Sequence, residues 1–114
     1  MVKDWTDIAK NLGGAIGELR TGIPEVMKAF GQMDAALAKD GALSPKTKEL
    51  IALALGVAAR CDGCLAFHAR AAAKHGADRA EILEMIGMAI YMGGGPSVIY
   101  GAQALEAFDQ WKAA

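Results

Sequence analysis

The chain has 114 residues, which is enough for one domain and too short for two. Its formal net charge is −1, and only 6% of its residues are aromatic. We therefore expect no nucleic-acid partner, because phosphate binding needs a surplus of Lys and Arg, and single-stranded bases need aromatic side chains to stack on.

The N-terminal region carries charges throughout and lacks the apolar core of a signal peptide. The uncharged run 50–59 is too short to span a bilayer, and the uncharged stretch 85–105 is interrupted by Gly-Gly-Gly-Pro at 93–96. We predict a soluble, cytoplasmic protein without a membrane partner. In a reducing cytosol, two cysteines close in sequence are typical of a catalytic or metal-binding site rather than a structural disulfide.

Strand patterns are weak throughout, and good helix formers dominate the composition. A short amphipathic helix is predicted over about residues 3–12, ending at Gly13-Gly14. The second helix begins at Pro24, which suits a first helical position, and ends near Lys39. Its apolar residues recur at helical spacing: Val26, Phe30, Met33, Ala36 and Leu37.

The third and fourth helices have clear boundaries. Ser44 and Pro45 form a typical helix start, with a side-chain cap followed by proline. The third helix becomes almost wholly apolar after Glu49, which indicates that protein surrounds it. The fourth helix covers about residues 61–75 and is closed by Gly76.

The last two helices are separated by the glycine-rich break. Asp78 and Glu81 match a capping box and open a helix that reaches about Met92. A final helix is predicted over about residues 97–111. The fold class is therefore all-α, a bundle of about six helices, and its excess of apolar helix surface indicates a homo-oligomer.

The chemistry of the chain concentrates at the start of the fourth helix. At 100° per residue, Cys61, Cys64 and His68 fall on one stripe, with His68 one turn beyond Cys64. A helix N-terminus favours a thiolate, the reactive form of cysteine. A Cys-x-x-Cys pair can also close to a disulfide without long-range movement.

Other candidates are weaker on spacing alone. Glu49 lies at the edge of an apolar helix and needs a partner, but the sequence does not say whether it meets the cysteines. His75 near a helix C-terminus is better explained by a structural role. The three methionines 85, 88 and 92 indicate core or subunit packing.

The pattern E-x11-C-x2-C-x3-H, formed by Glu49, Cys61, Cys64 and His68, resembles the active-site signature of AhpD-like alkylhydroperoxidases in the carboxymuconolactone decarboxylase superfamily. The resemblance extends over roughly residues 20–110. It implies an AhpD-like domain over 20–114 with an N-terminal helical extension over 1–19. It also implies a trimer or hexamer, and no cofactor or metal.

The resemblance further implies a role for each residue. Cys64 attacks the peroxide, Cys61 resolves the resulting sulfenic acid as its disulfide partner, and Glu49 with His68 forms a proton relay. The substrate is then a hydroperoxide or a disulfide, and an external dithiol is the reductant. The family pattern has a histidine just before the second cysteine, where this chain has Gly63, so the implied relay is shorter.

Two other functions remain open at this point. Cys61, Cys64 and His68 could supply three ligands to zinc, with Glu49 or water as the fourth. A redox-sensing or scaffold oligomer would form the disulfide without turnover. Carboxymuconolactone decarboxylation fits less well, because that branch of the superfamily generally lacks the cysteine pair.

Overall fold

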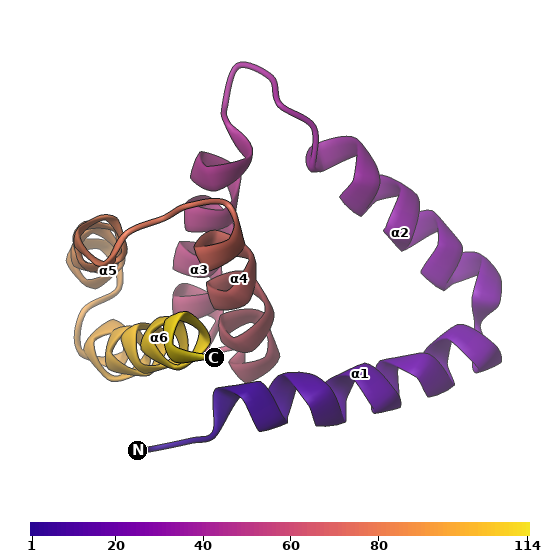
Figure 1. Cartoon of the computed structure of the whole chain (residues 1–114), viewed down its shortest axis with the longest axis horizontal. Coiled ribbons are helices and arrows are strands. Elements are labelled where there is room, and N and C mark those ends of the chain that lie inside the picture. Colours follow the sequence, from indigo (N-terminus) through magenta and orange to yellow (C-terminus); the bar gives the residue numbers. More distant parts are fainter.

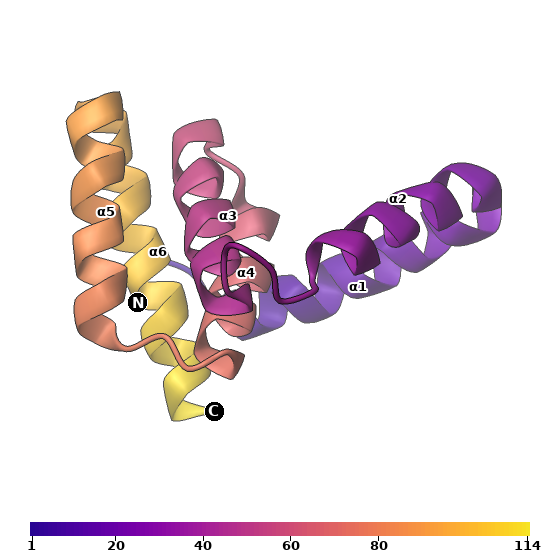
Figure 2. The same cartoon turned by 90° about the horizontal axis from the view of Figure 1, so that it is seen from above.

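A computed structural model describes all residues 1–114 and contains six α-helices and no strand. The predicted all-α fold is therefore confirmed. Helices α3 to α6 form the body of the molecule, while α1 and α2 extend together to one side of it (Figures 1 and 2). The helices are α1 (Trp5–Gly22), α2 (Pro24–Leu37), α3 (Pro45–Ala59), α4 (Asp62–Lys74), α5 (Arg79–Gly93) and α6 (Gly95–Ala113).

The first helix is longer than predicted. The expected end at Gly13-Gly14 is wrong, because α1 continues through both glycines to Gly22. Each glycine costs about 1 kcal/mol of helix propensity, but Trp5 is fully buried and anchors the first turn in the core. The helix ends before Pro24, where the residue preceding a proline is disfavoured in helical conformation.

The boundaries of α3, α4 and α5 follow the predicted capping residues. The Ser44 side chain caps α3, and the Asp78–Glu81 capping box opens α5. Arg60 ends α3 in the left-handed conformation, with φ 54°, so that α4 can begin two residues later. Helix α6 begins at Gly95, slightly earlier than predicted.

The core lies between α3, α4, α5 and α6, with the start of α1 packed against α4 and α6. Alanines let these helices approach closely, and a few large side chains fill the centre. The largest fully buried side chains are Trp5, Leu53, Val57, Leu65, Ile82 and Phe108. None of the six helices is both long and apolar enough to cross a membrane.

Helix α2 has no buried residue. The residues of its apolar stripe are largely exposed to solvent, and Phe30 is 65% exposed. Further apolar side chains are exposed on α5 and α6, including Met88 and Met92, whereas Met85 packs partly against the core. Exposed apolar area of this extent is unusual for a small monomer.

The residues before α1 are held to α6 by Glu106. Its carboxylate accepts hydrogen bonds from the backbone N–H groups of Val2 and Lys3 and from the indole N–H of Trp5, at 2.8, 2.9 and 3.0 Å. Burial acts to raise the pKa of Glu106, but these donors outweigh burial, and the pKa is lowered. Glu106 thus anchors the N-terminal residues as a carboxylate.

This anchor should make stability depend on pH. A carboxyl group with a lowered pKa in the folded state stabilises the fold above its unfolded-state pKa of about 4.3. That stabilisation is lost as the pH falls through the folded-state value. We expect wild type to exceed Glu106→Gln in free energy of unfolding at pH 7, and the gap to close below about pH 4. Urea unfolding followed by tryptophan fluorescence measures this difference in free energy of unfolding. A difference that stays the same at low pH would contradict the role of the carboxylate.

Candidate functional site

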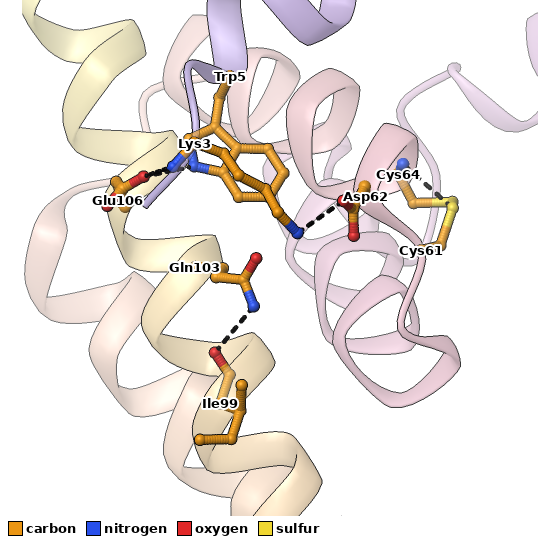
Figure 3. Close-up of polar contacts among 8 residues, drawn as sticks. All are labelled: Lys3, Trp5, Cys61, Asp62, Cys64, Ile99, Gln103 and Glu106. Atoms are coloured by element: carbon orange, nitrogen blue, oxygen red, sulfur yellow. Dashed lines mark hydrogen bonds and ion pairs between the residues drawn. A yellow bond between two sulfur atoms is a disulfide. The ribbon is translucent and has the colours of Figure 1, made fainter. Parts of the chain in front are cut away.

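The two cysteines form a disulfide at the junction of α3 and α4. Cys61 is the N-cap of α4, and its Sγ accepts a hydrogen bond of 3.2 Å from the Cys64 N–H, as Figure 3 shows. Both cysteines are half-buried, so reagents and partner thiols can reach them. After reduction, the free N–H groups and positive end of the α4 dipole would stabilise a thiolate here.

Glu49 and His68 meet between α3 and α4. Glu49 Oε2 lies 2.6 Å from His68 Nδ1, although the two residues are nineteen apart in sequence. The two helices are joined by a two-residue connection, which brings the first turns of α3 beside the middle of α4. A carboxylate that accepts the Nδ1 proton leaves Nε2 free to accept another one. Spacing alone could not say which residue Glu49 contacts, and in the structure it contacts the imidazole of His68.

Close packing of α3 on α4 depends on Gly56. A Cβ atom at Gly56 would lie 3.1 Å from the Cβ of Cys64, which is closer than such atoms normally come. Gly56 lies on the buried side of α3. This glycine lets the α3 backbone lie directly against the second cysteine.

Gly63, between the two cysteines, is packed under α1. A Cβ atom at Gly63 would lie 2.8 Å from Cδ1 of Leu12. Leu12 lies within the helix predicted from the sequence, but nothing in the sequence paired that helix with the cysteines. A histidine before the second cysteine, as in the AhpD pattern, would require Leu12 to move.

We expect Gly63→His to lower the free energy of unfolding by about 1–3 kcal/mol, because the larger side chain overpacks the contact with α1. In Gly63→His with Leu12→Ala, the total loss should be smaller than the sum of the two single losses. Urea unfolding of the four proteins measures this coupling. Strict additivity would show that Leu12 does not restrict this position.

An open cavity of about 350 Å³ lies beside the Glu49–His68 pair, between the end of α2, α3 and α4. Its walls are mostly apolar, and the charged and imidazole side chains that line it are Asp34, Lys48, Glu49, His68 and His75. Its apolar walls include Leu37, Leu43, Ile51 and Leu55.

Two features of this cavity were not expected from the sequence. His75 is the C-cap of α4, in line with the expected structural position, and it also lines the cavity. Lys48 donates to the carbonyl oxygens of Leu37 and Lys39, at 3.0 and 2.7 Å, and so holds the end of α2 against α3. Cations at a helix C-terminus are a known signal, but sequence alone could not pair Lys48 with α2.

Asp62, the other residue between the cysteines, is bound by Lys3. Lys3 Nζ lies 2.7 Å from Asp62 Oδ2 (Figure 3). This hydrogen bond lowers the pKa of the Asp62 carboxyl group against the opposing effect of burial, and Tyr100 adds to the lowering. Neither Lys3 nor Asp62 was expected from the sequence to belong to the site.

With both sulfurs in the disulfide, no group of three or more His, Cys, Asp or Glu side chains is arranged to hold a metal ion. The zinc site considered from spacing needs Cys61, Cys64 and His68 as joint ligands. The contacts observed are a sulfur–sulfur bond and a carboxylate–imidazole pair. This arrangement gives no support to the zinc hypothesis.

Comparison with known proteins places the chain in one family. The sequence model of the carboxymuconolactone decarboxylase family matches residues 24–107. An uncharacterized protein of Cupriavidus necator is 42% identical over 96 residues, covering 84% of this chain and 82% of that protein.

Two solved structures are similar over nearly the whole chain. The apo form of a carboxymuconolactone decarboxylase family protein from Legionella pneumophila has a TM-score of 0.91 and 48% identity, and the match covers 94% of this chain and 96% of that one. A family protein from Thermotoga maritima, with a suggested involvement in antioxidative response, has a TM-score of 0.78 and 26% identity. That match covers 97% of this chain and 92% of that one.

Proposed function

The chain belongs to the carboxymuconolactone decarboxylase family, and we propose that it acts there as a thiol-dependent peroxidase or disulfide reductase. The observation that carries this proposal is the 2.6 Å contact of Glu49 with His68, one helical turn beyond a Cys61–Cys64 disulfide. A redox dithiol beside an oriented imidazole is the arrangement that thiol chemistry needs. We assign the protein to the cytoplasm, where a reducing dithiol pool can regenerate the pair.

The reaction begins with the reduced pair. The Cys64 thiolate attacks the outer oxygen of a hydroperoxide, so that an S–O bond forms, the O–O bond breaks and the alcohol leaves with one proton. Cys61 then attacks the sulfenic acid, which forms the disulfide and releases water. An external dithiol returns two electrons and two protons by disulfide exchange. With a disulfide substrate, the thiolate attacks sulfur instead, and no water is released.

We assign the nucleophile to Cys64 because of its place on α4. His68 follows Cys64 by one turn, on the same stripe of the helix. Glu49 holds the imidazole by Nδ1, so that Nε2 is the nitrogen available to take the thiol proton and return it to the leaving oxygen. Cys61, as the N-cap, is adjacent and free to resolve the intermediate.

The cavity beside the relay supports an organic substrate. Its apolar walls, from α2 and α3, suit a hydrocarbon chain, while Glu49 and His68 lie at one side of it. We therefore propose alkyl hydroperoxides, rather than hydrogen peroxide alone, as the oxidants. Reduction of alkyl hydroperoxides would give the protein an antioxidant role.

The exposed stripe of α2 supports the predicted homo-oligomer, a trimer or a hexamer. Val26, Phe30, Met33 and Leu37 are each more than half exposed, and no element of the same chain covers them. A second copy of the chain would bury this stripe and close the α2 side of the cavity. Light scattering coupled to gel filtration measures the mass directly, and a monomer at micromolar concentration would contradict this assembly.

The redox proposal is tested by titrating thiols. We expect the reduced protein to lose two thiols on addition of one equivalent of an organic hydroperoxide. Steady-state turnover with dihydrolipoamide as the reductant should follow. Disulfide formation without turnover on any dithiol would favour a sensor, and retention of both thiols would overturn the redox function.

A further inference from the structure

Both residues between the two cysteines are contacted by the N-terminal part of the chain. Lys3 binds Asp62 with its ammonium group, and Leu12 packs against Gly63. We call residues 2–12 the N-terminal segment; it includes most of the predicted extension over residues 1–19. The N-terminal segment therefore contacts both residues between the cysteines, and Figure 3 shows its contact between Lys3 and Asp62.

Lys3 is held in place from several sides, unlike an ordinary surface lysine. Its backbone N–H donates to Glu106, and its backbone carbonyl accepts from Gln110 at 2.8 Å. Its ammonium lies 5.5 Å from the ring centre of Trp5 and 5.6 Å from that of Tyr100. Exposed ion pairs usually contribute little because the side chains must be ordered first. Here the backbone contacts and the two rings have already fixed the ammonium beside Asp62.

The charge of Asp62 opposes the chemistry of the site. A carboxylate next to a cysteine disfavours the thiolate by like-charge repulsion. Asp62 is the first residue of α4, directly between Cys61 and the glycine that precedes Cys64. In Figure 3 its side chain lies between Lys3 and the cysteine pair. A cation bound to Asp62 compensates this repulsion.

We propose that Lys3 is a positioning residue that sets the reactivity and redox equilibrium of the Cys61–Cys64 pair by neutralising Asp62. The other titratable groups near the pair are Tyr100 on α6, which acts on Asp62, and Glu49 on α3 and His68 on α4, which bind each other. Stabilising the thiolate stabilises the reduced form of the pair, so Lys3 makes the disulfide easier to reduce. This inference rests on the proposed redox role of the cysteines.

The test compares a variant that removes the positive charge of Lys3 with one that removes the negative charge of Asp62. Lys3→Met keeps the aliphatic stem against Trp5 and Tyr100 but removes the charge, so the reduced thiols should react with iodoacetamide roughly two- to five-fold more slowly at pH 7. Asp62→Asn leaves the Lys3 charge uncompensated and should accelerate alkylation by a similar factor. The double variant should be close to wild type, and Lys3→Arg is the matched control that retains the charge.

The same proteins are equilibrated with mixtures of reduced and oxidised glutathione. Lys3→Met should require a more reducing mixture to open the disulfide, and Asp62→Asn a less reducing one. If the ion pair had a purely structural role, both variants would change the alkylation rate and the glutathione equilibrium in the same direction. Shifts of the same sign would therefore overturn the proposal, and so would the absence of any shift. Neither measurement needs turnover, so opposite shifts in a protein without peroxidase activity would refute the proposed function and leave this inference standing.

Discussion

Replacing Cys64 with serine is expected to reduce peroxidase turnover at least about 1000-fold, because the hydroxyl is not ionised near neutral pH and cannot replace the thiolate as nucleophile. The protein should still fold, since serine differs from cysteine in one atom and Cys64 is half-buried. The measurement is the rate of organic hydroperoxide consumption with excess dithiol. Consumption at the wild-type rate would show that Cys64 is not the attacking residue.

Cys61→Ser is the matched comparison. It removes the other sulfur of the same disulfide. In the reduced protein without added dithiol, we expect it to consume about one equivalent of hydroperoxide and then stop, with a sulfenic acid on Cys64 that a dimedone probe labels. If instead Cys61→Ser is inert and Cys64→Ser reacts once, the two roles are exchanged, and the N-cap position rather than the imidazole selects the nucleophile.

Glu49→Gln should lower kcat/KM for hydroperoxide by roughly 100- to 1000-fold. The glutamine can still reach His68 across the 2.6 Å contact, but it lacks the charge that holds the proton on Nδ1 and stabilises the imidazolium. The expected loss is in proton transfer, so the rate of disulfide formation should fall while the disulfide itself still forms. Stopped-flow measurement of thiol loss separates this step from later reduction.

His75→Gln is the control for this prediction. His75 lines the same cavity but caps the end of α4, away from the Glu49–His68 contact. We expect less than a three-fold change in kcat/KM, since no proton transfer depends on it. An equal loss in Glu49→Gln and His75→Gln would mean that both act through the shape of the cavity, and the relay would be refuted.

Local signals in the sequence determined most of the fold. The caps at Ser44 and Asp78 and the proline at residue 24 correctly placed three helix starts, because a cap is satisfied by residues within one turn. The same local reasoning failed at Gly13-Gly14. There α1 continues through both glycines to Gly22 despite their weak helix propensity, although only Trp5 and Ala9 of this helix are buried in the core.

The chemistry of the site divides in the same way. The sequence by itself determined that two sulfurs and an imidazole lie along the first half of one helix, because spacing within a helix sets which side chains are neighbours. Only the tertiary structure decided that Glu49 reaches His68, that Leu12 covers Gly63 and that Lys3 binds Asp62. Each of these contacts joins parts of the chain that are far apart in sequence, so it depends on how α1, α3 and α4 pack against one another. No periodicity in the chain encodes such a contact. The family resemblance had implied a relay of Glu49 and His68, but the contacts made by Lys3 and Leu12 could not be found before the fold was known.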